Sequence, residues 1–209
     1  AQLARVRPLY ATSFFGSSFA SLGDLQGHGF VDPAVGAPVN ILSSVYILYF
    51  QSHSSIRAYT LIRGQYEADD SNTTLQALNT TSNITNWGFN GPPIHYLSKF
   101  GTSLANVGDI DGDNITDLAV GSNSESKGID IVQILFLQKN GTIREWSTIG
   151  SGIGGGPVIP MTFSKFGSSI TTLGDFDGDG VNDLVIGARY LYDFLYTNSR
   201  SGVIYMCFM

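Results

Sequence analysis

The chain has 209 residues with a formal net charge of −6, and 43% of its residues are hydrophobic while 13% are charged. This composition disfavours an intrinsically disordered chain, which has few hydrophobic and many charged residues, and the acidic balance disfavours a nucleic-acid-binding protein, which needs a basic face. The 25 glycines and the 12% of aromatic residues are typical of an all-β protein rich in turns.

In chain order, the first predicted element is a candidate outer strand over residues 1–10, where Pro8 suits an edge strand that needs no backbone donor. Three repeats then follow, and they align with each other without gaps. In every copy the Phe of a Phe-Gly pair stands 9 residues before an aspartate and 21 residues before a later glycine. The three sets are Phe15, Asp24 and Gly36; Phe100, Asp109 and Gly121; and Phe166, Asp175 and Gly187.

Each repeat predicts the same succession of strands. The stretch from Phe-Gly to Leu-Gly-Asp is the first strand, and the segment that ends at the second glycine is the next. The third strand is strongly apolar and does not alternate, so both of its faces are expected to be buried. A fourth, more polar strand is expected in the first two repeats. The apolar strands are predicted over 45–50, 131–137 and 203–208, and the fourth strands over 56–62 and 142–146.

Four short strands per repeat predict an all-β fold made of β-propeller blades, in which each sheet packs between two others. The blades are expected over approximately 11–63, 97–149 and 163–209, within one region that spans 1–209. A polar insertion is expected over 64–96. The glycines of the Phe-Gly pairs, Gly16, Gly101 and Gly167, are expected to allow tight packing or a positive φ.

Two short loops hold eight of the 14 aspartates. Both loops place carboxylates at positions 1, 3, 5 and 9 and can add the backbone carbonyl at position 7. This oxygen-rich set suits calcium, which takes six to eight oxygen ligands, better than it suits magnesium. Neither loop has the glutamate at position 12 that an EF-hand needs. A solvated Asp-Gly turn is the simpler interpretation, but four carboxylates within nine residues repel one another unless a cation neutralises them. The predicted calcium ligands, for two ions, are Asp109, Asp111, Asp113, Ile115, Asp117, Asp175, Asp177, Asp179, Val181 and Asp183.

The corresponding loop of the first repeat, Asp24 to Asp32, has Gln26 and His28 in place of two aspartates. We expect no calcium there at ordinary concentrations. A transition-metal role for His28 has no support from a histidine or cysteine nearby in the sequence.

The succession of motifs in these repeats resembles the FG-GAP repeat of integrin α-subunit propellers. The motifs are Phe-Gly, Leu-Gly-Asp, the Asp-x-Asp-Gly-Asp loop and the Gly36-Ala37-Pro38 tripeptide. The second copy departs from the pattern with Gly121-Ser122-Asn123, and the third with Gly187-Ala188-Arg189. The resemblance implies structural calcium ions in the loops. It also implies a propeller with more blades than three, so further blades are expected from a longer protein or from another copy of this chain.

The leading functional hypothesis is a non-enzymatic, extracellular or cell-surface binding module for cell adhesion or ligand recognition, with a protein or glycan ligand. Five Asn-x-Ser/Thr sequons, at Asn72, Asn79, Asn83, Asn114 and Asn140, favour a secreted glycoprotein. Two alternatives are a lectin-like propeller, which would use an exposed aromatic such as Trp87, Tyr96 or Trp146, and a non-catalytic accessory domain of a secreted enzyme. No catalytic motif surrounds the three histidines.

Overall fold

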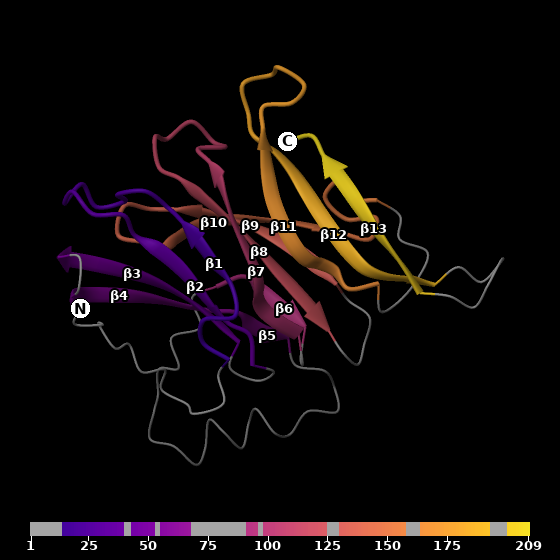
Figure 1. The fold of residues 1–209 in the computed structure, drawn as a ribbon, viewed down its shortest axis with the longest axis horizontal. Helices are drawn as coiled ribbons and strands as arrows, with labels where there is room; N and C mark the ends of the chain where they lie inside the picture. Colours follow the sequence, from indigo (N-terminus) through magenta and orange to yellow (C-terminus); the bar gives the residue numbers. More distant parts are fainter. Residues whose placement is uncertain are drawn as a thin grey trace, which may run out of the picture.

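The computed structural model describes residues 14–39, 43–52, 55–67, 91–95, 98–124, 130–157, 164–192 and 200–209. Over these ranges the chain is all-β, and three antiparallel sheets lie next to one another like the leaves of a fan (Figure 1). The predicted fold class is therefore confirmed. Across the same ranges, no helical segment has the length and hydrophobicity that a membrane crossing requires.

Each sheet is a meander in which strands that follow one another in the chain are hydrogen-bonded neighbours. The first sheet contains β1 (Phe19–Ser21), β2 (Pro33–Ala37), β3 (Ser44–Ser52) and β4 (Ser55–Arg63). The second contains β7 (Ser98–Gly108), β8 (Asp117–Ser124), β9 (Ile131–Leu137) and β10 (Ile143–Gly150). The third contains β11 (Phe166–Gly174), β12 (Asp183–Tyr192) and β13 (Arg200–Cys207).

Two details differ from a set of three equal four-stranded units. In the described residues the third sheet has three strands, and β1 has only three residues because the chain turns at Phe15–Ser17 before it becomes extended. A short parallel ladder of β5 (Gln65–Glu67) and β6 (Pro93–His95) lies inside the predicted insertion. The candidate strand over 1–10 and residues 68–90 of the insertion lie outside the described residues.

Within the described residues the core has three apolar layers, one on each side of the second sheet and a third on the outer face of the first sheet. Ile47 of β3 and Leu118 of β8 belong to the layer between the first and second sheets, and both are fully buried. Ile134 of β9 and Ile186 of β12 belong to the layer between the second and third sheets. Burial of β3 and β9 follows from this stacking, because each apolar strand has a packed layer on both faces of its sheet.

The same contact joins each sheet to the next. The hydroxyl of Ser18 donates to the carbonyl of Gly101 (2.7 Å), and the hydroxyl of Ser103 donates to the carbonyl of Gly167 (2.6 Å). A Cβ added at Gly36 would lie 2.2 Å from the Gly101 carbonyl oxygen, so no side chain fits between the two strands. Gly101 and Gly167 have φ angles of 87° and 75°, as predicted for the glycines of the Phe-Gly pairs.

The apolar strand of the third repeat is not buried on both faces, so that prediction was wrong for 203–208. Ile204 is 72% exposed and Phe208 is 57% exposed, whereas Tyr205 turns inward and packs edge-on against Phe166. The reason is position, because β13 is the edge of the third sheet and, among the described strands, none covers the sheet's outward face.

Candidate metal centres in the hairpin loops

Each of the three sheets has a nine-residue loop between its first two strands, and the three loops lie along the same rim of the fan (Figure 1). These loops are residues 24–32, 109–117 and 175–183, which are the segments that the sequence singled out. The two acidic loops begin directly after one strand ends and finish where the next begins. In the first loop, backbone hydrogen bonds between Leu22 and Asp32 (2.9 Å) and between Asp32 and Gly23 (2.7 Å) close the two ends.

The aspartate at position 1 organises the turn. Asp109 accepts hydrogen bonds from the backbone N–H groups of Gly112 (2.8 Å), Asp113 (3.0 Å) and Asn114 (2.7 Å). Asp175 accepts them from Gly178 (2.6 Å) and Gly180 (2.9 Å). A carboxylate that satisfies several backbone donors fixes a tight loop without help from a helix or a third strand.

The aspartate at position 9 is buried. Asp117 is fully buried and Asp183 is 1% exposed. In Asp117, Oδ2 accepts from the N–H of Ile110 (3.0 Å) and Oδ1 from that of Leu137 (3.1 Å). Burial raises the pKa of the Asp117 carboxyl to about 6, against the opposing effect of these two hydrogen bonds.

Asp183 repeats this arrangement in the third loop. Its Oδ2 accepts from the N–H of Phe176 (2.8 Å), and its Oδ1 accepts from that of Met209 (3.2 Å). In both loops the last aspartate therefore ties the loop to its own start and to the end of the third strand.

The structure gathers three of the four predicted carboxylates in each acidic loop. Each member of these groups places a carboxylate oxygen within 4.8 Å of the others. The position 5 aspartates, Asp113 and Asp179, are outside these groups, and each accepts a hydrogen bond from the N–H two residues later (2.8 Å in both). The ligand role of the Ile115 and Val181 carbonyls stays a prediction. The two gathered sets are Asp109, Asp111 and Asp117, and Asp175, Asp177 and Asp183.

Arginines on the fourth strands contact position 3 of their loops, a feature that sequence reasoning missed. Arg144 on β10 pairs with Asp111, and its Nη1 lies 3.8 Å from Asp113 Oδ2. Arg57 on β4 donates to the side-chain oxygen of Gln26 in the first loop. The shared Ile-Arg pairs at 56–57 and 143–144 were the available signal, since they start equivalent strands.

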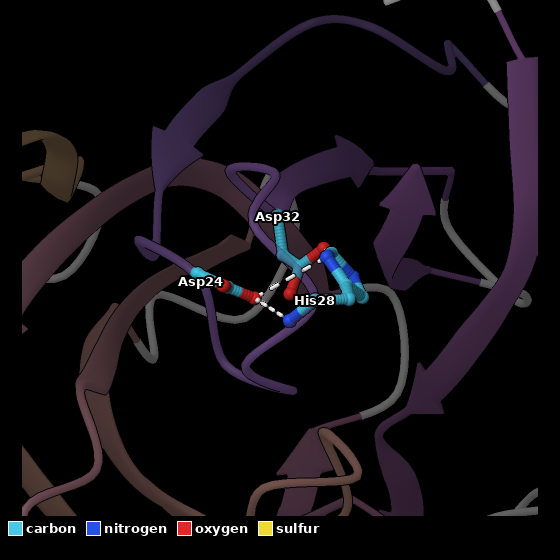
Figure 2. A group of neighbouring side chains, drawn as sticks. All are labelled: Asp24, His28 and Asp32. Carbon is cyan, nitrogen blue, oxygen red and sulfur yellow. Dashed lines mark hydrogen bonds and ion pairs between the residues drawn. The ribbon is translucent and has the colours of Figure 1, made fainter. Parts of the chain in front are cut away.

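The first loop brings together three side chains at positions 1, 5 and 9 (Figure 2). The Nδ1 atom of His28 lies 3.3 Å from Asp24 Oδ1, and its Nε2 atom lies 3.1 Å from Asp32 Oδ1. Asp24 and Asp32 stand at the positions of Asp109 and Asp117 in the second loop. The sequence near His28 holds no second histidine or cysteine, and the pairing of His28 with the loop's own carboxylates was not predicted.

The electrostatic environments of the two carboxylates differ. A hydrogen bond from the backbone N–H of Gly29 is the main cause that lowers the pKa of Asp24. Burial raises the pKa of Asp32, while the charge of a protonated His28 would lower it. Asp32 is fully buried and is held through Oδ2 by the N–H of Leu25 (3.1 Å).

Comparison with known proteins shows similarity to FG-GAP repeats and to integrin α subunits. The FG-GAP repeat family model matches residues 100–142 and 166–205, which contain both acidic loops. Integrin alpha-PS5 of Drosophila melanogaster is 28% identical over 184 residues, and the match covers 86% of this chain and 16% of that protein.

Two further similar proteins are also integrin α subunits. Integrin alpha-4 of Xenopus laevis is 26% identical over 200 residues, covering 94% of this chain and 16% of that protein. Integrin alpha-8 of Gallus gallus is 34% identical over 100 residues, and the match covers 44% of this chain and 9% of that protein. The chain therefore spans only a small part of the length of these relatives.

Proposed function

From the premise that the chain is an FG-GAP repeat protein similar to integrin α subunits, we propose that it is a calcium-stabilised extracellular binding module for cell adhesion or ligand recognition. The observation that carries the proposal is the repeated gathering of three carboxylates in the loops of the second and third sheets. The proposed module binds and does not catalyse.

The chemistry of these loops supports calcium. Their side-chain ligands are carboxylate oxygens, and hard oxygen donors are what calcium prefers. The proposed side-chain ligands are the two gathered sets together with Asp113 and Asp179, and the Ile115 and Val181 carbonyls would add one oxygen each. A bound ion would neutralise the mutual repulsion of the carboxylates and fasten the loop to the buried aspartate at position 9.

We infer that the outward face of the third sheet packs against a further FG-GAP blade. Ser169 and Gly187 occupy the positions of Ser18 and Gly36, which meet the Phe-Gly glycine of the next sheet. Around them the face is apolar, with Ile204 72% exposed and Met206 43% exposed. Two identical contacts already join the three sheets, so a third contact of the same kind is the natural partner for this face.

The extracellular location is supported by the sequons and by the relatives. Asn114 and Asn140 are exposed, which glycosylation requires. Asn72, Asn79 and Asn83 lie outside the described residues. Expression in a secreting eukaryotic host, followed by glycopeptide mass spectrometry, tests this part of the proposal.

Calorimetric titration of calcium into chelator-stripped protein tests the metal. We expect two ions per chain, and one ion in either the Asp109→Asn or the Asp175→Asn variant. Asp24→Asn is the matched control, because it changes the equivalent position of the first loop and should leave two ions. Absence of binding at millimolar calcium would contradict the calcium part of the proposal.

Ligand class is tested separately, with arrays of extracellular-matrix proteins and of glycans probed by calcium-loaded and chelated protein. We expect binding to a protein that chelation weakens. Binding to glycans alone would favour the lectin-like alternative, for which Trp146, 40% exposed on β10, is the described aromatic candidate. Trp87 and Tyr96 lie outside the described residues.

A further inference from the structure

The first loop has the frame of a metal site but a different set of donors from the other two. Its first and last carboxylates are kept, and an imidazole replaces the carboxylate at position 5 (Figure 2). The amide of Gln26 at position 3 is already hydrogen-bonded by Arg57. One nitrogen and two carboxylates fall short of the oxygen-rich set that calcium needs, yet they suit zinc and related dications.

Two buried atoms in this loop have no hydrogen-bond partner. These atoms are His28 Nε2 and Asp32 Oδ1, and they lie 3.1 Å apart without hydrogen-bond geometry. Asp32 is fully buried, and a buried polar atom left unpaired is costly. Two ligands at about 2.0–2.2 Å from one zinc ion in tetrahedral geometry are roughly 3.3–3.6 Å apart. The spacing of this pair is close to that of two neighbouring ligands of a single ion, and the two atoms would separate slightly on binding.

The other loops show that this free oxygen is specific to the first loop. In the second loop the Oδ1 of Asp117 accepts from the Leu137 N–H, and in the third loop the Oδ1 of Asp183 accepts from the Met209 N–H. The Oδ1 of Asp32 has no such backbone donor and faces the imidazole instead. The histidine and the free oxygen therefore occur together in one loop.

We propose that Asp24, His28 and Asp32 bind a divalent transition-metal ion of the zinc class, through His28 Nε2, Asp32 Oδ1 and a carboxylate oxygen of Asp24. This site is separate from the proposed calcium loops and does not depend on them.

Binding of an ion at Nε2 changes the protonation of the His28 ring. In the metal-free loop the N–H of Phe30 donates to Nδ1 (3.2 Å), so a neutral ring carries its proton on Nε2. An ion at Nε2 requires that proton on Nδ1 instead. Nδ1 then becomes a donor, so the Phe30 N–H must turn away from it when an ion binds.

The competing interpretation is that a protonated imidazole neutralises both carboxylates and takes the place of an ion. Both ring nitrogens do face carboxylates, as an imidazolium would require. The two interpretations differ in what zinc does. An ion site binds zinc and shifts the ring signals of His28, whereas an imidazolium bridge excludes zinc and titrates with pH.

The experiment is a calorimetric zinc titration of the whole chain in excess calcium, which keeps the acidic loops filled. We expect one zinc ion per chain, and a cobalt(II) titration should give the visible absorption of a nitrogen- and oxygen-ligated ion. His28→Gln should weaken zinc binding by more than about 100-fold, since loss of an outer-shell partner alone costs 10–100-fold. His95→Gln is the matched control and should bind zinc like the unchanged chain.

Two-dimensional NMR of the histidine rings in the unchanged chain avoids any dependence on variant folding. Zinc should shift the His28 ring signals while those of His53 and His95 stay in place. No zinc uptake at millimolar concentration, or equal uptake by His28→Gln, would overturn the proposal. A His28 ring that titrates but ignores zinc would establish the imidazolium bridge instead. Calcium stoichiometry in the same samples reports separately on the proposed function.

Discussion

Replacement of Gly121 by alanine tests whether the close glycine contact holds neighbouring sheets in register. A Cβ at this position would lie 2.3 Å from the carbonyl oxygen of Gly167 on the next sheet. It would also lie 2.2 Å from Ser103 Oγ, the hydroxyl that donates to that same carbonyl. The backbone of β11 must therefore move away from β8.

The expected cost follows from these contacts. Separating the sheets by about 1 Å strains the apolar layer between them, and overpacking of this kind costs about 1–3 kcal/mol. Weakening the Ser103 hydrogen bond adds about 0.5–1.5 kcal/mol. Alanine recovers about 0.4–1 kcal/mol by restricting the unfolded chain. We expect the free energy of unfolding to fall by about 2–3 kcal/mol.

Gly187→Ala is the matched control, because Gly187 has the same place in the third sheet. Its added Cβ would meet the movable Ser169 Oγ at 2.3 Å, but the nearest backbone atom, the Ser169 carbonyl oxygen, is 3.7 Å away. We expect a change within about 0.5 kcal/mol, as for surface substitutions. Urea unfolding of both variants in excess calcium measures the difference. Equal losses in the two variants would refute the argument that the facing carbonyl makes Gly121 indispensable.

Three other predictions concern charge. The folded pKa of Asp117, about 6, exceeds its unfolded value of 3.8. The metal-free chain should therefore lose up to about 3 kcal/mol of unfolding free energy as the pH rises from about 4 to above 6. Urea unfolding in chelator should show this slope, and the Asp117→Asn variant should lack it. Asp130 is buried and accepts from the N–H groups of Ser124 (3.0 Å) and Lys165 (2.6 Å), which belong to different repeats, so Asp130→Ala should cost about 3 kcal/mol in thermal unfolding and Asp130→Asn less. Arg144→Gln should raise the calcium affinity of the second loop about two- to five-fold, because the guanidinium competes with the ion for Asp111. Calorimetry in an Asp175→Asn background measures this loop alone. An unchanged affinity would show that the arginine does not oppose the ion.

Repeat spacing was sufficient to predict the fold because it reports a three-dimensional constraint. The 21-residue spacing from Phe100 to Gly121 includes a strand, the acidic loop and the returning strand, and it places the glycine opposite Ser103 in the ladder. The same pairing holds between Gly187 and Ser169. Any insertion within that span would break the register, so insertions such as 64–96 fall between repeats.

The features that the sequence did not predict depend on what lies opposite a residue in space. The apolar strand over 203–208 has the same residue types as β3 and β9, and only its place at the edge of the third sheet leaves Ile204 exposed. The contact of Arg144 with Asp111 joins positions 33 residues apart. Neither is visible in local composition, because both depend on which surfaces face one another after the sheets have stacked.

The donors in the first loop can be traced to the strand behind it. The two backbone donors, Leu137 and Met209, each lie one residue beyond the position that is opposite the last aspartate of their loop. In the first sheet, the residue at the same place on β3 is Phe50. There the register of β3 against β4 shifts on both sides of Phe50. We attribute the missing backbone donor to this irregularity, which leaves Asp32 Oδ1 facing His28. A change in strand regularity thus alters the donor set of a loop, and the first loop differs from its neighbours in its backbone as well as in its side chains.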